Sequence, residues 1–427
     1  MEKQASITVI FGPNGSGKTQ YVEKMRRQLA SDRMRYLAFS DAYGPATDKA
    51  YYLQLRWNQH DIDEETPTVG TLLERAYRQS GEDSEDRRQL RDSLYQRFSM
   101  QPLLDKYIIL LSSGELRKFQ IIKTLLANPS VLILDNPFIG LDATARQQLS
   151  ELLYMLAHEQ GITLYLVIAR RGDIPSYADE IIEMEGEERP TPQPVLPEQP
   201  TLTPSTSDVV IDMHNVSIRY GERTILQNLD WRVMKGERWA LSGDNGSGKS
   251  TLLSLVCADN PQGYACDIAL FGHQRGSGES IWEIKRRIGY VSPEMHRSYQ
   301  RNLPTIHVVA SGMKDSIGLY AHPSAEEKAL CLQWMQTFGI AHLAERPFIT
   351  LSSGEQRLAL VARAFVKNPE LLILDEPLHG LDDHNRQLVR AVIEQFCQRP
   401  DKTFIMVTHY EEELPKCINK KLYLTKR

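Results

Sequence analysis

Cysteine is scarce in this chain and unevenly placed. Only five of the 427 residues are cysteine, and all five lie in the second half. They are Cys257, Cys266, Cys331, Cys397 and Cys417, and no two of them have the spacing of a C-x-x-C motif. The missing C-x-x-C spacing and the odd number of cysteines favour reduced thiols in a cytoplasmic protein over a metal or disulfide site.

Long apolar runs and an excess of charge of one sign are also missing. The longest apolar runs, such as 131–134 and 371–374, have the length of strands, whereas a membrane-spanning helix needs about 20 apolar residues. The 50 basic and 55 acidic residues give a formal net charge of -5, which offers no electrostatic basis for nucleic-acid binding. The start of the chain has no apolar signal-peptide core, so we expect a cytoplasmic protein without membrane insertion, at most peripheral at the inner face of a membrane.

What the chain does contain is an internal repeat. The repeated segments are 12–19 and 243–250, 111–115 and 351–355, 131–135 and 371–375, and 140–142 and 380–382. Their offset is 249 − 18 = 231 residues for the first pair and 375 − 135 = 240 for the others. Residues 185–208, which hold six prolines, are typical of an extended, semi-rigid linker. We therefore expect two copies of one domain, at residues 1–184 and 209–427.

Each copy alternates predicted strands with predicted helices. Short β-type runs, Ile7–Phe11 and 239–242, precede the glycine-rich segments. The runs 131–134 and 371–374 are continuously apolar, as buried parallel strands are. This order predicts an α/β fold with two tandem phosphate-loop domains, each a mainly parallel sheet with flanking helices and a helical subdomain.

The glycine-rich segments fit the pattern G-x-x-x-x-G-K-[ST] of a phosphate-binding loop. Glycines let backbone N–H groups converge on phosphate oxygens, and the following helix N-terminus adds a partial positive charge. A plain glycine turn is the alternative, but two copies after strands favour ATP with Mg²⁺. The predicted nucleotide-binding residues are Gly12, Asn14, Gly15, Ser16, Gly17, Lys18, Thr19 and Gln20 in the first copy, and Gly243, Asn245, Gly246, Ser247, Gly248, Lys249, Ser250 and Thr251 in the second.

Hydroxyl and carboxylate side chains supply a predicted Mg²⁺ site in each copy. Thr19 and Ser250 would hold the ion through their hydroxyls. Asp135 and Asp375 each end an apolar strand, where a carboxylate can reach the same ion. Capping of a following helix is the alternative for either aspartate, but the upstream loop favours the metal role.

With these motifs in place, the chain resembles the ABC ATPases over nearly its whole length outside the linker. The L-S-S-G-E segments are similar to the signature sequence of that family, and G-L-D looks like its D-loop. In the family, two domains pair head to tail, with ATP between the phosphate loop of one and the signature of the other. The resemblance implies that the signature residues Ser112, Ser113 and Gly114, and Ser352, Ser353 and Gly354, contact nucleotide. Ser113 and Ser353 stand where the family usually has glycine.

The resemblance also implies that the two copies differ in catalytic power. Glu376 follows Asp375 and matches the residue that orients and polarises the attacking water, whereas Asn136 stands there in the first copy. An amide cannot act as a base, so the first site should hydrolyse ATP poorly. His409 resembles the family's switch histidine at the γ-phosphate, with a surface histidine as the alternative, and Arg170 takes its place in the first copy.

Two further positions follow from the resemblance. Tyr220 resembles the aromatic residue that stacks on adenine, with a core or turn tyrosine as the alternative. The first copy has only eleven residues before Gly12, so we expect its base-binding edge and antiparallel subdomain to be missing or supplied by another segment. For the glutamine that senses the γ-phosphate, Gln54 is the better candidate metal ligand and Gln59 the alternative, while Glu294 stands there in the second copy.

If the two domains pair, two composite sites follow. The first combines Lys249, Ser250, Asp375, Glu376 and His409 with the signature at 112–114, and we expect it to hydrolyse ATP. The second combines Lys18, Thr19, Asp135, Asn136 and Arg170 with the signature at 352–354, and we expect it to bind nucleotide weakly or to hold it unhydrolysed.

Which process the ATPase drives is a separate question, because the same type of ATP-hydrolysing domain serves many functions. The tract 260–282 resembles the ModF-type tandem ATPases associated with molybdate transport, which implies a membrane permease as partner. Two alternatives stay open. One is a soluble ATPase acting on ribosomes or nucleic acid, which the acidic charge and Pro-rich linker disfavour, and the other is a nucleotide-gated binding module with little turnover.

Overall fold

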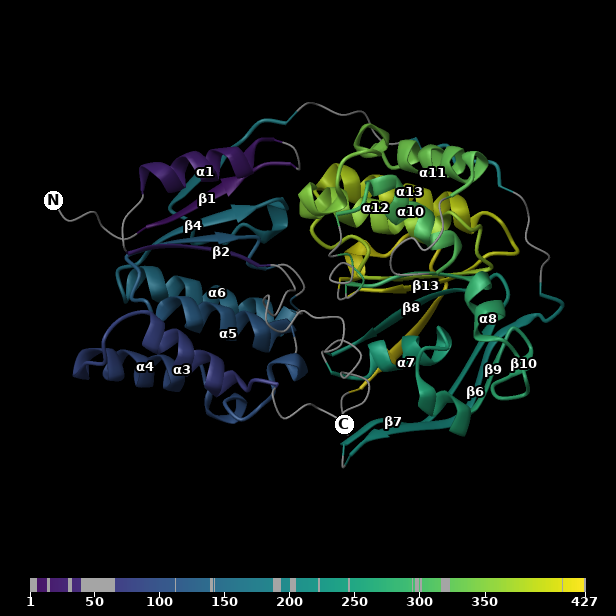
Figure 1. Ribbon diagram of the computed structural model, residues 1–427, viewed down its shortest axis with the longest axis horizontal. Coiled ribbons are helices and arrows are strands. Elements are labelled where there is room, and N and C mark those ends of the chain that lie inside the picture. The colour runs from purple at the N-terminus through teal and green to yellow at the C-terminus, as the bar shows by residue number, and fades with distance from the viewer. Residues whose placement is uncertain are drawn as a thin grey trace. The chain divides into compact units, whose positions relative to one another are not determined.

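The computed structural model divides the chain into two compact units, Met1–Glu188 and Arg189–Arg427 (Figure 1). It describes residues 6–13, 16–29, 33–39, 66–111, 113–138, 141, 143–186, 193–199, 205–221, 223–244, 246–293, 295, 299, 302–315, 323–408 and 410–425. Each unit has its own hydrophobic cores, which are built on its own sheet.

The first unit is built on one parallel sheet with the strand order β2-β3-β4-β1-β5. The strands are β1 (Ile7–Phe11), β2 (Met34–Ala38), β3 (Val131–Asp135), β4 (Thr163–Ile168) and β5 (Glu180–Glu183). Figure 1 shows α1 (Lys18–Gln28) on one face of this sheet and α5 (Ser113–Leu125) and α6 (Ala143–His158) on the other. All residues of β1 are buried, because helices cover both faces of the sheet.

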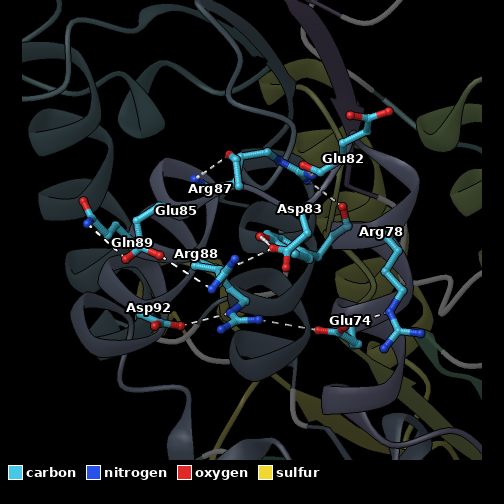
Figure 2. Close-up of polar contacts among 12 residues, drawn as sticks. Glu74, Arg78, Glu82, Asp83, Glu85, Arg87, Arg88, Gln89 and Asp92 are labelled. Atoms are coloured by element: carbon cyan, nitrogen blue, oxygen red, sulfur yellow. Dashed lines mark hydrogen bonds and ion pairs between the residues drawn. The ribbon is translucent and has the colours of Figure 1, made fainter.

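Two further helices of the first unit, α3 (Val69–Gln79) and α4 (Glu85–Arg97), pack beside α5 and are joined by a short polar connection. Thr68 and Ser84 cap their N-termini. Figure 2 shows charged side chains of the two helices and of their connection, among them Arg87. Its guanidinium donates to the Tyr77 carbonyl and to the Ser80 hydroxyl, each at 2.6 Å, so it ties α4 to the end of α3.

The second unit contains a parallel sheet with the order β11-β12-β13-β8-β14 and an antiparallel sheet with the order β10-β9-β6-β7. The strands are β6 (Val209–Tyr220), β7 (Arg223–Met234), β8 (Arg238–Gly243), β9 (Asp267–Leu270), β10 (His273–Gln274), β11 (Ile288–Val291), β12 (Leu371–Asp375), β13 (Thr403–Val407) and β14 (Lys420–Leu424). The helices are α7 (Lys249–Val256), α8 (Ile281–Arg287), α10 (Thr305–Ala310), α11 (Ala325–Thr337), α12 (Ser353–Phe365) and α13 (Asp383–Cys397). Figure 1 shows α7 between the two sheets and α12 and α13 on the opposite face of the parallel sheet.

The two parallel sheets are copies of each other down to their strand register. Ile7 of β1 pairs with Leu164, and Arg238 of β8 pairs with Phe404. These pairs differ by the sequence offsets of 231 and 240 residues. The predicted tandem α/β fold with parallel sheets is therefore confirmed. Every strand in the described part of the first unit belongs to its parallel sheet, whereas the second unit adds the antiparallel sheet.

Part of the Pro-rich segment lies against the second unit. Residues 193–199 have no regular secondary structure, and Leu196 packs on the core around α12. The Thr337 hydroxyl donates to the Val195 carbonyl at 2.8 Å, and the Gln199 amide donates to the Val366 carbonyl at 2.7 Å. The Val366 carbonyl lies just beyond α12, so Gln199 satisfies a helix end that would otherwise lack a donor. The expected linker is thus anchored along part of its length.

Candidate nucleotide-binding sites

Each glycine-rich loop connects a parallel strand to the N-terminus of a helix. Gly17 and Gly248 immediately precede α1 and α7 with φ of 84° and 95°, a left-handed conformation that favours glycine. At Gly243 a side chain is excluded by space as well, because a Cβ atom would lie 2.2 Å from the Leu424 carbonyl oxygen. The glycines therefore allow a backbone path that directs N–H groups toward a phosphate.

Both loop lysines fold back on their own loops. The Lys18 ammonium donates to the carbonyls of Gly12 and Pro13 at 2.5 and 2.7 Å. Lys249 makes the same contacts with the second loop, at 2.6 Å to the Gly243 carbonyl and 2.9 Å to the Asp244 carbonyl. Each lysine thus places a positive charge at its loop, as a phosphate site needs.

Two serine hydroxyls in the loops are buried without a partner. Neither Ser16 Oγ nor Ser247 Oγ has a hydrogen-bond partner among the described residues, and Ser247 is only 2% exposed. A buried hydroxyl left unpaired is costly, so such atoms usually mark a missing ligand or water. Their matching positions in the two loops fit the oxygens of a bound phosphate.

The aspartate that ends β3 is held by two side-chain donors. The Tyr36 hydroxyl donates to Asp135 Oδ2, and the Asn136 amide donates to Asp135 Oδ1, both at 2.9 Å. Burial raises the pKa of the Asp135 carboxyl, while the Tyr36 hydroxyl and the charge of Lys18 act in the opposite direction. The lysine is therefore close enough to act on the carboxylate, as expected when both face one ligand.

Oxygen donors of the type that Mg²⁺ prefers gather at both loops. Thr19 and Ser250 are exposed in the first turns of α1 and α7, and Asp375 at the end of β12 is 9% exposed. No group of three His, Cys, Asp or Glu side chains in the described ranges could hold a metal by itself. Mg²⁺ commonly takes one or two carboxylates together with substrate phosphates, so the residues present fit this ion.

Asn136 and Glu376 occupy the same backbone position in the two units. Their N–H groups donate to the carbonyls of Val167 and Val407, both at 2.9 Å. Their φ angles are 51° and 49°. The chemical difference is therefore confined to the side chain, where a carboxylate can accept a proton from water and an amide cannot.

Beside Glu376 lies a residue that the sequence motifs did not single out. His379 Nδ1 is 3.3 Å from Glu376 Oε2. The first copy has Ile139 at the matching place, and this difference within the repeat was the signal available in the sequence. Tyr36, the partner of Asp135, was also missed, because nothing in its local sequence predicts a contact across 99 residues.

The second signature lies at the start of α12, where Ser352 is the N-cap in a capping box. The Ser352 hydroxyl donates to Glu355 Oε2 at 2.8 Å and accepts from the Glu355 N–H at 3.4 Å. Ser353 is exposed and Gly354 is buried. The hydroxyl expected at a phosphate is thus engaged within its own helix and would have to exchange partners.

Tyr220 lies in a core of the second unit. It is 7% exposed, and its hydroxyl accepts a hydrogen bond from the Asn260 amide at 2.9 Å. Little of the ring is available to stack on a base, and this placement matches the core tyrosine that sequence reasoning kept as the alternative. Adenine stacking by Tyr220 stays a prediction.

Several predicted site residues lie outside the described residues. They are Asn14, Gly15, Gln54, Gln59, Ser112, Asn245, Glu294 and His409. For Ser113 and Gly114 the structure describes the backbone only. Arg170, in the place of the switch histidine, lies within the described part, and its guanidinium is 3.8 Å from Asp173 Oδ1. Gln20 is exposed and Thr251 is buried in the first turns of α1 and α7.

Comparison with known proteins gives consistent matches. The family model described as ABC transporter matches residues 3–139 and 226–379. The ABC transporter ATP-binding protein ModF of Escherichia coli (strain K12) is 37% identical over 455 residues, which cover 96% of this chain and 89% of that protein. An uncharacterised ABC transporter ATP-binding protein of Schizosaccharomyces pombe is 29% identical, over 97% of this chain and 91% of its own length. The resemblance to ModF-type ATPases is confirmed.

Two solved structures share the fold over almost the whole chain. The RNase-L Inhibitor aligns with a TM-score of 0.53 and 18% identity, over 98% of this chain and 83% of that chain. The archaeal ribosome recycling factor, in a complex with a ribosomal stalk protein, aligns with a TM-score of 0.54 and 18% identity, over 99% and 83%. At this identity the likeness concerns the fold alone. None of the helices in the described part of the chain has both the length and the apolar character needed to span a bilayer.

Proposed function

The chain belongs to the ABC transporter family of ATP-binding proteins, and from this premise we propose that its C-terminal domain hydrolyses ATP while its N-terminal domain binds nucleotide without efficient turnover. One observation carries the proposal. Glu376 and Asn136 share their backbone hydrogen bond and φ angle, so the two units present different side chains at one place. A carboxylate there activates water, and an amide does not.

In the C-terminal domain the residues divide the work as follows. Lys249 leaves the loop carbonyls for the β- and γ-phosphates, and the Ser247 hydroxyl gains an acceptor. Ser250 and Asp375 hold Mg²⁺, which when bound offsets the negative charge of the phosphates. Glu376 orients the attacking water and accepts its proton, and His409 contacts the γ-phosphate. Lys18, Thr19 and Asp135 repeat the binding part of this arrangement in the first domain.

Replacing Glu376 by glutamine tests the assignment. Glu376→Gln keeps the size and the turn but removes the base, so we expect steady-state ATP turnover to fall by about 100-fold or more with nucleotide binding retained. Asn136→Ala is the matched variant of the other domain, and it should keep most of the turnover. Phosphate release and equilibrium binding of a fluorescent ATP analogue measure the two effects. Equal loss of turnover in both variants contradicts the assignment.

We further propose that the two domains pair head to tail, so that each signature serves the other domain's nucleotide. The support is the family resemblance and the presence of both motif sets in one chain. The variants Ser352→Ala and Ser112→Ala separate the sites. On this proposal, Ser112→Ala slows turnover at the Glu376 site and Ser352→Ala leaves most of it.

We propose that this ATPase drives transport across a membrane. Molybdate is the solute that the ModF-type resemblance implies. The support is the 37% identity to ModF over 96% of the chain. The Glu376→Gln protein with ATP holds the nucleotide-bound state, so capture from solubilised membranes should recover a permease. A cell lacking the protein should also contain less molybdenum at limiting molybdate. Recovery of ribosomes in place of a permease contradicts the transport assignment.

A further inference from the structure

Glu376 has an imidazole beside it that comes from its own turn. His379 Nδ1 lies 3.3 Å from Glu376 Oε2. The His379 N–H also donates to the Glu376 carbonyl at 3.2 Å, so one short turn presents both side chains. Leu378 and Leu381, 1% and 2% exposed, anchor this turn in the core. The backbone of one anchored turn therefore places the imidazole beside the carboxylate.

The surroundings of His379 leave its nitrogens unsatisfied. The side chain is 10% exposed, and neither Nδ1 nor Nε2 makes a hydrogen bond of good geometry in the part of the chain that the structure describes. A buried polar group in this state calls for an explanation. Glu376 is the charged group at 3.3 Å, and its side chain is 18% exposed. Catalytic hydrogen bonds are often long in the absence of ligand and tighten when it binds.

The first domain provides an internal comparison. It combines Asn136 with Ile139, where the second domain combines Glu376 with His379. The backbone at the first position of each pair is the same, with φ of 51° and 49°. The second unit thus has an imidazole three residues after the carboxylate, whereas the first unit has an apolar residue three residues after the amide.

We propose that His379 is the positioning residue for the base of the C-terminal site. Its Nδ1–H donates to Glu376 Oε2 and holds the carboxylate so that the other oxygen, Oε1, faces the attacking water. Fixing the direction of a base raises the rate of the chemical step and leaves the affinity for ATP unchanged. The inference rests on the proposed hydrolysis at Glu376.

Two substitutions at His379 in the full-length protein separate positioning from packing. His379→Asn places an amide donor close to the position of Nδ1, and His379→Leu keeps bulk without a donor. We expect His379→Leu to lower kcat by about 10- to 100-fold at unchanged KM for ATP. His379→Asn should stay within about 3-fold of the original kcat because its amide can donate to the same carboxylate. His273→Leu, on the exposed strand β10, is the control and should leave turnover unchanged.

A double variant identifies Glu376 as the group through which His379 acts. Residues that work as a unit are not additive, so His379→Leu should cause no further loss in a Glu376→Gln background. An unchanged kcat in His379→Leu overturns the inference while hydrolysis at Glu376 stands. So does an equal loss of kcat and of melting temperature in both His379 variants, or an additive loss in the double variant. Full turnover in Glu376→Gln alone overturns the proposed function and this inference with it.

Discussion

Ser247 illustrates how a residue proposed to bind nucleotide can weaken the free protein. Its hydroxyl is buried at the bottom of the second loop and lacks a partner among the residues described. Ser254, within α7, is also buried, but its hydroxyl donates to the Thr251 carbonyl at 2.7 Å and accepts from the Asn260 amide. A buried serine without a partner in the loop and a buried, hydrogen-bonded serine in α7 therefore offer a matched pair.

We predict that Ser247→Ala leaves the free protein as stable as before or stabilises it by up to about 1 kcal/mol, because an unpaired desolvated hydroxyl is removed. The same change should weaken ATP binding and reduce the rise in melting temperature that ATP causes. Ser254→Ala, by contrast, should lower the melting temperature with and without ATP. Thermal unfolding of both variants at several ATP concentrations measures these effects. A destabilised free Ser247→Ala protein contradicts the prediction.

Single residues of the site could be predicted where backbone geometry dictates the residue type. The glycines, lysines and strand-ending aspartates have a fixed spacing because a phosphate loop needs them there. Tyr36 reaches Asp135 from a neighbouring strand, and Tyr220, at the end of β6, is buried in a core of the second unit. Contacts of this kind depend on tertiary packing, which no local pattern in one sequence contains.

At the level of elements, the packing of α3 against α4 depends more on the Arg87 guanidinium than on the ion pairs at the surface of these helices. Arg87 donates to three acceptors around the end of α3 and lies 4.3 Å from the centre of the Tyr77 ring (Figure 2). The pairs of Arg78 with Glu74 and of Arg88 with Asp83 are exposed. Exposed pairs add little to stability because water and salt screen them.

We predict that Arg87→Met lowers the free energy of unfolding of the N-terminal domain by about 1–2 kcal/mol, since hydrogen bonds from a charged group and a ring contact are lost. Arg75→Met, at an exposed position of α3, serves as the control and should change it by less than about 0.5 kcal/mol. Urea unfolding followed by a fluorescent label on the N-terminal domain distinguishes the two. Equal effects of both variants contradict the role assigned to Arg87.

Strands with continuous apolar runs could be predicted from the sequence. The contacts of the Pro-rich segment with the second unit could not. The strands β3 and β12 were expected from continuous apolar runs, and the structure has them at Val131–Asp135 and Leu371–Asp375. The Pro-rich segment has no apolar period, so its composition predicts an extended chain but not the surface that it follows. Leu196 and Gln199 find their partners only once α12 is folded.

At the scale of the whole molecule, part of the predicted linker at 185–208 is grouped with the C-terminal unit. The second unit begins at Arg189, twenty residues before β6 begins at Val209. Ser205 adds a further anchor, because its N–H donates to Glu370 Oε2 at 3.0 Å. Residues 193–199 and 205–208 thus pack as part of this domain.

We predict that a chain of residues 193–427 is more stable than one of residues 209–427. Loss of the Gln199, Thr337 and Ser205 hydrogen bonds and of Leu196 packing should remove about 2 kcal/mol, which lowers the melting temperature by about 5 °C for a domain of this size. Differential scanning calorimetry of both chains, next to the C-terminal transition of the full-length protein, makes the comparison. Equal melting temperatures show that the segment adds no stability.

The left-handed turn after β12 has an evolutionary consequence. Glu376 holds φ at 49°, and most L-residues pay roughly 1–2 kcal/mol for such a backbone, whereas asparagine tolerates it. Asn136 occupies the matching turn of the first unit without that penalty. A mutation from glutamate to asparagine at this place therefore relieves strain as it removes the base. On the proposed function, the loss of hydrolysis in one copy of a duplicated domain by this change therefore carries no cost in backbone strain.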